Sequence, residues 1–346
     1  MVITSSAIAD GVTDNTAVLQ SEIHAAAGNA LYIPAGDYKF SNLSIINHNT
    51  KIHGDGQATR LITNSPTGDM LSVGNGPNEI RNIELEDFVL WSSVQRTAHA
   101  AISCAKIVRS NFENVYVGTL EDYNANGNRL YDGIAITEFG SVSINGGNII
   151  SAHNGLYCRG NGSQDFGAEL FIGGGYRVVH CAVGGIVIAG GAGGVKIDDI
   201  DVSNCGSGLI VNSDGAGAFN REIFIGSEAS FDGCANYGMQ FAPNSCVYVE
   251  IDGAWCASNF IGVCIEGGQP ADATFKLSDM RISRNNNHGI YAGDGVVLCV
   301  GTQMTNNGYG TFGGNGLYRA GTAKPMIFNG GYAANNGAGG AGSGIE

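Results

Sequence analysis

A glycine followed by a short apolar run recurs along most of the chain. The runs begin at Gly133, Gly155, Gly185, Gly208, Gly238, Gly262, Gly289 and Gly316. Successive glycines are 22 to 30 residues apart. A repeat of this length is typical of a solenoid, in which each repeat forms one coil and buries its apolar side against the neighbouring coils.

A second pattern lies between the glycine runs. Triplets with apolar first and last residues occur at 142–144, 170–172, 195–197, 223–225, 249–251, 275–277, 298–300 and 326–328. A second short strand is predicted after the triplet, for example at 200–202 and 229–231, and then a corner rich in asparagine and cysteine. Each coil therefore has three predicted strands. Because side chains alternate along a strand, the middle residue of each triplet should face outward and its neighbours the core.

Residues 8–40 follow a different pattern. Apolar residues at helical spacing, including Leu19 and Ile23, predict a helix that Thr13 or Asp14 could cap and that ends near Gly28. A strand at 31–33 and a Pro-Ala-Gly-Asp turn follow. The first coil of a solenoid would otherwise expose a sheet edge and an apolar interior, so a covering helix is expected there.

The segments DGVTDNTAVLQ (10–20) and LYIPAGDY (31–38) resemble the entry segment of the pectate-lyase-like superfamily of right-handed parallel β-helices. That superfamily includes phage tailspikes, polygalacturonases, pectate lyases and alginate epimerases. The resemblance implies a carbohydrate-active β-helix, most similar to a phage tailspike depolymerase, and tailspikes of this type are homotrimers. The specific lyase and polygalacturonase motifs of the superfamily are not found here, so no catalytic residue is carried over from it.

These patterns together predict an all-β fold, a single-stranded right-handed parallel β-helix with three strands per coil and an N-terminal capping helix. The predicted parts are a cap at 1–40, the β-helix at 41–336 and a flexible C-terminal end at 337–346. Residues 118–131 form a polar insertion that contains Glu121 and Asp122. The 55 glycines, without collagen's three-residue period, fit many tight turns between short strands.

The composition limits the classes of binding partner and the compartment that the protein could occupy. The net charge of −14 argues against a nucleic-acid partner, because binding phosphates needs a basic surface. No stretch approaches the roughly 18 apolar residues of a membrane span, and no signal peptide is predicted. The nine cysteines form no CxxC pair and are expected to be reduced thiols in the core. We therefore expect folding in a reducing cytosol, followed by a location in a virion tail or outside the cell.

Candidate chemistry lies on the predicted outward face of the triplet strands. Acidic residues gather on three neighbouring coils, at Asp198, Glu222, Glu250 and Asp252, and are the predicted catalytic residues. The predicted substrate-binding residues among them are Lys196, Arg221, Phe224, Tyr248 and Lys276. No cofactor and no metal are predicted, because no Cys/His metal spacing, phosphate-binding glycine loop or calcium-loop pattern occurs.

The predicted register sets the spacing of these carboxylates. Glu222 and Glu250 lie on a diagonal of about 8 Å between Cα atoms, as in cross-strand diagonals. Glu250 and Asp252 are about 6.7 Å apart along one strand. Inverting glycosidases need about 6.5–9.5 Å between carboxyls and retaining ones about 5–5.5 Å, so either mechanism stays open. Glu250 beside Lys276 is equally an ordinary cross-strand ion pair.

Three functions follow from these features. The first is a glycoside hydrolase that depolymerises a bacterial surface polysaccharide (capsule, exopolysaccharide or O-antigen) with an Asp/Glu acid and base. The second is a lyase or epimerase acting on a uronate polymer, which needs a cation and a base such as Tyr248. The third is a carbohydrate-binding solenoid without catalysis, because a fold alone does not settle function.

Overall fold

The computed structural model describes residues 1–74, 77–118, 130–160, 168–213, 218–308, 314–320 and 324–337. It divides into two compact units, and each is built of parallel strands. Unit 1 comprises Met1–Asn161 and Gly167–Ala182, and unit 2 comprises Gly162–Phe166 and Val183–Glu346. The predicted fold class is confirmed, since the chain is an all-β parallel β-solenoid of about 11 turns. The boundaries at residues 40 and 336 stay predictions. Glu121, Asp122 and residues 338–346 lie outside the described residues.

In unit 1, the first two strands of the coils belong to one sheet. They are β1 (Val2–Thr4), β2 (Asp10–Asp14), β3 (Ala30–Tyr32), β4 (Gly36–Phe40), β6 (Lys51–His53), β7 (Thr59–Thr63), β10 (Glu84–Ser92), β13 (Ser110–Val117), β15 (Ser141–Ile150), β17 (Glu169–Gly173) and β18 (Tyr176–Val179). The third strands form another sheet, made of β5 (Leu43–Ile45), β8 (Leu71–Val73), β11 (Ala100–Ala105), β14 (Leu130–Thr137) and β16 (Ala152–Arg159). β9 (Ile80–Arg81) pairs with β12 (Ile107–Val108), and a 3-10 turn, η1, spans Gly56–Ala58.

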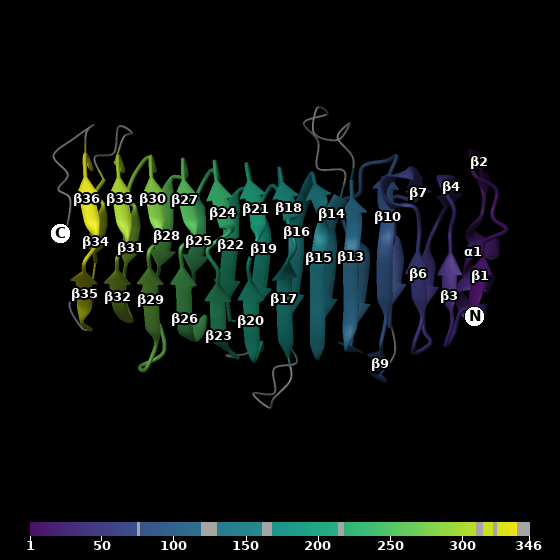
Figure 1. Cartoon of the computed structure of the whole chain (residues 1–346), viewed down its shortest axis with the longest axis horizontal. Helices are drawn as coiled ribbons and strands as arrows, with labels where there is room; N and C mark the ends of the chain where they lie inside the picture. The colour runs from purple at the N-terminus through teal and green to yellow at the C-terminus, as the bar shows by residue number, and fades with distance from the viewer. Residues whose placement is uncertain are drawn as a thin grey trace. The chain divides into compact units, whose positions relative to one another are not determined.

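In unit 2, each coil contributes three separate strands (Figure 1). The first strands are β20 (Gly194–Ile197), β23 (Asn220–Ile225), β26 (Cys246–Asp252), β29 (Thr274–Ser278), β32 (Val296–Val300) and β35 (Met326–Asn329). The second strands are β21 (Ile200–Ser203), β24 (Ala229–Asp232), β27 (Trp255–Ala257), β30 (Arg281–Ser283), β33 (Gln303–Thr305) and β36 (Tyr332–Ala334). The glycine-led third strands are β19 (Gly184–Ala189), β22 (Ser207–Asn212), β25 (Tyr237–Phe241), β28 (Ile261–Ile265), β31 (Ile290–Ala292) and β34 (Leu317–Arg319).

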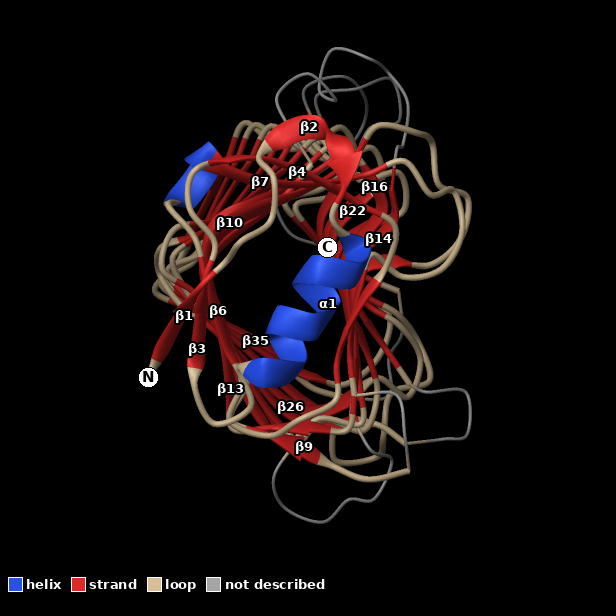
Figure 2. Ribbon diagram, turned by 90° about the vertical axis from the view of Figure 1, so that its right-hand side faces the viewer, coloured by secondary structure: helices blue, strands red, loops and turns tan. Residues whose placement is uncertain are grey.

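The predicted N-terminal helix exists and is α1 (Thr16–Ala25). It lies across the first coils of unit 1 and buries Leu19 and Ile23 (Figure 2). The Gln20 amide donates to the carbonyl of Ser44 in β5 at 2.8 Å and accepts from its N–H at 2.8 Å, so it pairs with the backbone edge of that strand. The N-cap position is later than the predicted Thr13 or Asp14, although the Asp14 carboxylate does accept from the N–H of Thr16, the first helical residue, at 2.9 Å. Asn15 is the N-cap residue, and its side chain bonds to Ile8 and Thr13 instead.

The predicted alternation of inward and outward residues holds along the first strands, with one exception. Register pairs Lys276 with Leu298, so Leu298 faces outward, while Cys299 is fully buried. The triplet predicted at 298–300 is therefore shifted by one residue from the real one at 297–299. The run from Val296 to Val300 is apolar throughout and carries no alternation from which the phase could be read.

A ladder of buried asparagines runs up the second corner of unit 2. At each corner a residue with a left-handed backbone, such as Arg284 (φ 57°) or Asn306 (φ 55°), is followed by an inward-facing residue. The inward residues are Cys205, Cys234, Asn259, Asn285, Asn307 and Asn336.

Asn259, Asn285 and Asn307 each bond to the next coil through the backbone N–H and to the preceding coil through the side-chain amide. The N–H of Asn259 donates to Oδ1 of Asn285 at 3.0 Å, and the N–H of Asn285 donates to Oδ1 of Asn307 at 3.2 Å. Nδ2 of Asn307 donates to the carbonyl of Ile282 at 3.1 Å. Asn259, Asn285 and Asn307 are fully buried, so these bonds satisfy polar groups that water cannot reach.

The ladder explains the glycines at positions 238, 262 and 289, next to which Asn259, Asn285 and Asn307 lie. A Cβ at Gly262 would lie 2.9 Å from Nδ2 of Asn285 and 2.5 Å from the carbonyl oxygen of Gly289. A Cβ at Gly289 would lie 2.9 Å from Nδ2 of Asn307. The asparagine side chain and the neighbouring glycine strand therefore occupy the space that any larger residue would need.

The cysteines are as predicted, since all nine are free and buried. Burial raises the pKa of the Cys246 thiol to about 12 and that of the Cys264 thiol to about 12, which keeps both protonated. None of the helices in the described part of the chain is long and apolar enough to span a membrane.

Replacing Asn285 with alanine should lower the free energy of unfolding by about 2–3 kcal/mol, because the buried N–H of Asn259 loses its acceptor. Chemical denaturation measures the change. Asn286→Ala is the matched control, because the exposed neighbouring side chain should matter by no more than about 0.5 kcal/mol. Equal stabilities of the two variants would contradict a structural role for the ladder.

Gly262→Ala should cost about 1–3 kcal/mol by overpacking against the next strand and the ladder. In contrast, a Cβ at Gly267 meets no atom within 4 Å, so Gly267→Ala should be neutral or stabilising by about 0.4–1 kcal/mol. Thermal unfolding of both variants checks the contrast. A Gly262→Ala protein as stable as the wild type would show that the close approach can relax.

Candidate functional site

The nine predicted site residues all lie in unit 2, in or next to β20, β23, β26 and β29. The observed register places Lys196 beside Phe224, Phe224 beside Glu250, and Glu250 beside Lys276. A second outward row contains Glu222 beside Tyr248. We call Glu222, Phe224, Tyr248, Glu250 and Lys276 the outer-face patch.

Glu250 is the centre of the outer-face patch. Its Oε1 accepts from Nζ of Lys276 at 2.5 Å, and its Oε2 accepts from the hydroxyl of Tyr248 at 2.9 Å. These two donors, Lys276 first, hold the pKa of Glu250 below its ordinary value. The same ion pair raises the pKa of Lys276, so both groups are charged at neutral pH. The predicted cross-strand ion pair is thus confirmed.

Phe224 and Glu222 complete the patch. The Phe224 ring is 37% exposed and lies 6.0 Å from the Tyr248 ring between centroids, with the planes tilted by 55°. Desolvation, followed by its bond to Glu250, raises the pKa of Tyr248, and the charge of Glu222 adds to the effect. Glu222 itself is exposed and lies one coil before Glu250 and diagonally from it, as the register requires.

The other four predicted site residues lie around the outer-face patch rather than in it. Asp198 follows β20, and its carboxylate lies over Gly226, where a Cβ would come within 2.1 Å of its Oδ1. Asp252 is exposed at the end of β26, with its charge close enough to raise the pKa of Lys276 slightly. Lys196 and Arg221 are exposed on the two preceding coils. Among the residues that the structure describes, no hydrogen bond joins Asp198 or Asp252 to Glu250.

The arrangement offers an ionised carboxylate, a neighbouring cation, a phenol and an open aromatic ring. An ionised carboxylate can act as a base or nucleophile, and aromatic rings can pack on sugars. Within the described residues, no group of three or more His, Cys, Asp or Glu side chains is placed to hold a metal ion.

A second set of polar residues lies in unit 1, and the sequence patterns did not single it out. It contains Asp69 and His99, which precede β8 and β11, Tyr131 and Asp132 in β14, and His153 and Asn154 in β16. The signal was available, because Tyr131-Asp132 and His153-Asn154 immediately precede Gly133 and Gly155 of the glycine repeat. Aligning the repeats on their glycines would have revealed it.

No protein-family model matches the sequence, and the search of curated proteins gave no match. Solved structures do match. The A-module of the Azotobacter vinelandii mannuronan C-5 epimerase AlgE4 is 14% identical, with 99% of this chain and 96% of that chain covered and a TM-score of 0.59. ORF18 of Geobacillus virus E2 is 13% identical over 96% of this chain but only 61% of its own, with a TM-score of 0.52.

A third match is the DFA-IIIase of Arthrobacter chlorophenolicus A6 without its lid, in complex with GF2. It is 12% identical, with 95% and 89% of the two chains covered and a TM-score of 0.52. At these identities the likeness shows the fold alone. It confirms the resemblance to pectate-lyase-like β-helices at the level of fold.

Replacing Lys276 with methionine should raise the pKa of Glu250 toward its ordinary value, because the strongest donor to its carboxylate is lost. An NMR titration of the Glu250 carboxyl carbon measures this. Lys196→Met, two coils away by register, is the control and should leave that pKa unchanged. An unshifted pKa in Lys276→Met would contradict the pairing.

The same pair should contribute little to stability, because it is partly exposed and screened by solvent. The folded-state pKa of Glu250 is lowered, so this contribution is present above the ordinary carboxyl pKa and is lost as pH falls through the lowered value. Denaturation of wild type and Lys276→Met at neutral and acidic pH should therefore show a stability difference that shrinks in acid. A stability difference that grows in acid would contradict a lowered pKa of Glu250 in the folded protein.

Proposed function

We propose that the chain is an enzyme acting on a polysaccharide at the outer-face patch of unit 2, and that it is a glycoside hydrolase. The observation that carries the proposal is the Glu250 carboxylate, held ionised by Lys276 and Tyr248 one coil from Glu222. The fold supports a carbohydrate substrate, since one structural neighbour is, by its name, an epimerase of mannuronan and another is held in complex with GF2.

In the proposed reaction Glu250 is the base or nucleophile and Glu222 is the general acid. Glu222 would protonate the glycosidic oxygen as the bond from the anomeric carbon to that oxygen breaks. Glu250 would either take a proton from the water that forms the new bond or attack the anomeric carbon itself. The side of Phe224 exposed beside Tyr248 offers a surface on which a sugar ring could stack. The parts of the polysaccharide farther from the cleaved bond would contact Lys196, Arg221, Asp198 and Asp252.

We extend the proposal to the kind of polysaccharide and to the setting in which the protein works. A bacterial surface polysaccharide is the proposed substrate, and a homotrimeric phage tailspike in the virion or outside the cell is the proposed setting. Support comes from the viral ORF18 among the structural neighbours and from nine buried free thiols, which suit folding in a reducing cytosol.

The second candidate is a lyase or epimerase on a uronate polymer. The observation that favours it is the Lys276 cation beside the Tyr248 phenol, since such chemistry needs a positive charge at the substrate carboxylate and a proton-transfer group. The Glu222 and Glu250 carboxylates disfavour it, because they would repel an anionic substrate.

Glu250→Gln and Glu222→Gln should each lower turnover by about 100-fold or more, the usual contribution of a positioned acid or base. Bacterial capsular and O-antigen polysaccharides serve as substrates, and new reducing ends report hydrolysis. Glu228→Gln, an exposed acid outside the patch, is the control and should keep full activity. Full activity in both patch variants would contradict the assignment.

The same reactions separate the candidates. Reducing ends without the ultraviolet absorbance of an unsaturated uronate indicate hydrolysis, whereas that absorbance indicates a lyase. Conversion of the uronate configuration without chain cleavage, read by NMR, indicates an epimerase. Binding without any product indicates the carbohydrate-binding solenoid.

A further inference from the structure

The polar residues found in unit 1 form a column across four successive coils. Register pairs Ala100 with Asp132 and Asp132 with Asn154, and the N–H of Ala100 donates to Oδ1 of Asp69 at 2.9 Å. The column therefore rises from Asp69 through His99 to Tyr131-Asp132 and His153-Asn154. With about 4.8 Å between coils, it spans about 14 Å.

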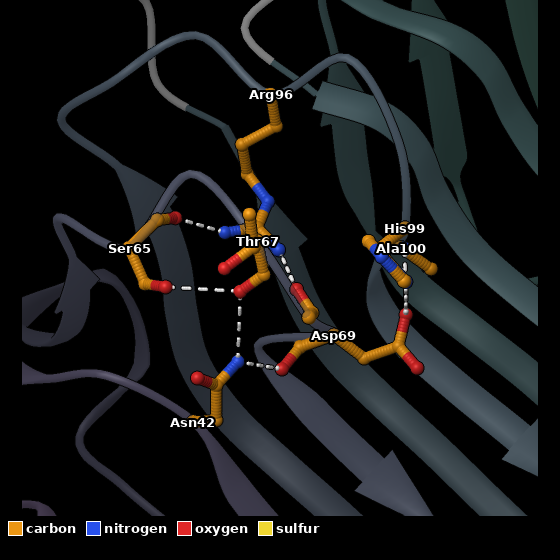
Figure 3. Close-up of polar contacts among 8 residues, drawn as sticks. Asn42, Ser65, Thr67, Asp69, Arg96, His99 and Ala100 are labelled. Carbon is orange, nitrogen blue, oxygen red and sulfur yellow. Dashed lines mark hydrogen bonds and ion pairs between the residues drawn. The ribbon is translucent and has the colours of Figure 1, made fainter.

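Hydrogen bonds hold the end of this column at Asp69 (Figure 3). Arg96 is 2% exposed, and its guanidinium donates to the carbonyls of Ser65 and Gly68. Nδ2 of Asn42 donates to the carbonyl of Asp69 at 2.5 Å. These bonds fix the loop before β8, so that the Asp69 carboxylate points away from Asn42 and toward His99, with Oδ1 3.8 Å from Nδ1.

The other end of the column, in β14 and β16, has a polar group without a hydrogen-bond partner. The Tyr131 ring stacks on the His153 ring at 4.6 Å between centroids with planes 8° apart, and Tyr131 is 37% exposed. Nδ2 of Asn154 donates to Oδ1 of Asp132 at 2.9 Å. Burial raises the pKa of Asp132 despite that bond, so this carboxyl holds its proton more tightly than an exposed aspartate. Nδ1 of His153 is buried and has no hydrogen-bond partner among the described residues.

A buried imidazole nitrogen without a hydrogen-bond partner is destabilising, so it needs an explanation. Unit 2 supplies the comparison. His288 stacks on Tyr318 at the same 4.6 Å, yet its Nδ1 accepts from the N–H of Asn315 at 3.1 Å. Stacking on a tyrosine therefore does not require an empty nitrogen, and an external polar group is the natural partner of His153.

We infer that Tyr131, Asp132, His153 and Asn154 form a second site on unit 1 that binds the hydroxyl groups of an uncharged saccharide. The Tyr131–His153 stack and the Asp132–Asn154 pair lie on the neighbouring strands β14 and β16, with His153 close enough to Asp132 to act on its carboxyl electrostatically. Together these groups can donate to and accept from hydroxyls beside an apolar surface. An anionic polymer fits less well. The ionisable groups of the column are Asp69, Asp132, His99 and His153, and the Arg96 guanidinium is engaged by backbone carbonyls.

This site is independent of the proposed catalysis. Its residues belong to unit 1, whereas the outer-face patch belongs to unit 2, and binding here requires no reaction at Glu250. The test therefore uses a readout that is specific to His153.

Selective labelling of the histidine ring carbon Cε1 gives at most one NMR signal for each of the seven histidines of the full chain. His153→Phe keeps the stack with Tyr131 and identifies the His153 signal by its loss. His288→Phe identifies the control signal in the same way. Neutral maltohexaose, cellohexaose and mannohexaose are titrated at constant pH, with a hexameric alginate as the anionic probe.

At least one neutral probe should shift the His153 signal saturably and leave the His288 signal in place. Asp132→Asn should weaken that binding at least tenfold, and Glu250→Gln should leave it unchanged while lowering turnover. The inference is overturned if no neutral probe shifts the His153 signal, if only alginate does, or if Asp132→Asn binds as tightly as the wild type. Loss of binding in Glu250→Gln would also overturn the independence of the two sites.

Discussion

The packing of a glycine against a buried asparagine is the constraint on which unit 2 depends. The inward amide of Asn285 occupies the place that a side chain at residue 262 would need, and it bonds to the coils on both sides. The second corner thus ties neighbouring coils together through side chains as well as through the strands. Where Cys205 replaces asparagine, its thiol takes the same place as a small apolar group, 3.3 Å from where a Cβ at Gly185 would lie.

Because the scaffold fixes every coil in register, the outer face is a set of parallel rows in which neighbours along the chain axis are about 4.8 Å apart. A row that brings Phe224, Glu250 and Lys276 together therefore needs no loop to assemble it. The electrostatics follow from the same rows. Lys276 neutralises Glu250 from the next coil, while Glu222 has no such cation directly beside it in register, where Tyr248 lies. The two carboxylates consequently have different surroundings, which is what a pair with different catalytic roles requires.

The fold and the rows of the outer face could be predicted because alternation and the repeat are visible in single residues. Ser143, Lys196 and Glu250 stand between apolar neighbours, which sets their phase. Leu298 could not be placed, because its neighbours are as apolar as it is. The N-cap position of Asn15 could not be predicted, because its side chain bonds to the distant Ile8 and makes no capping bond to the helix. Aligning the repeats on Gly133 and Gly155 could have located the polar column of unit 1, but the burial of Asp132 and of Nδ1 of His153 cannot be read from an alternating pattern.

The most direct test of the central claim is the crystal structure of Glu250→Gln with a fragment of a polysaccharide substrate. We expect a sugar ring against Phe224 and Tyr248, with a glycosidic oxygen within hydrogen-bond distance of Glu222. An ordered fragment bound elsewhere on unit 2, with the outer-face patch empty, would contradict it.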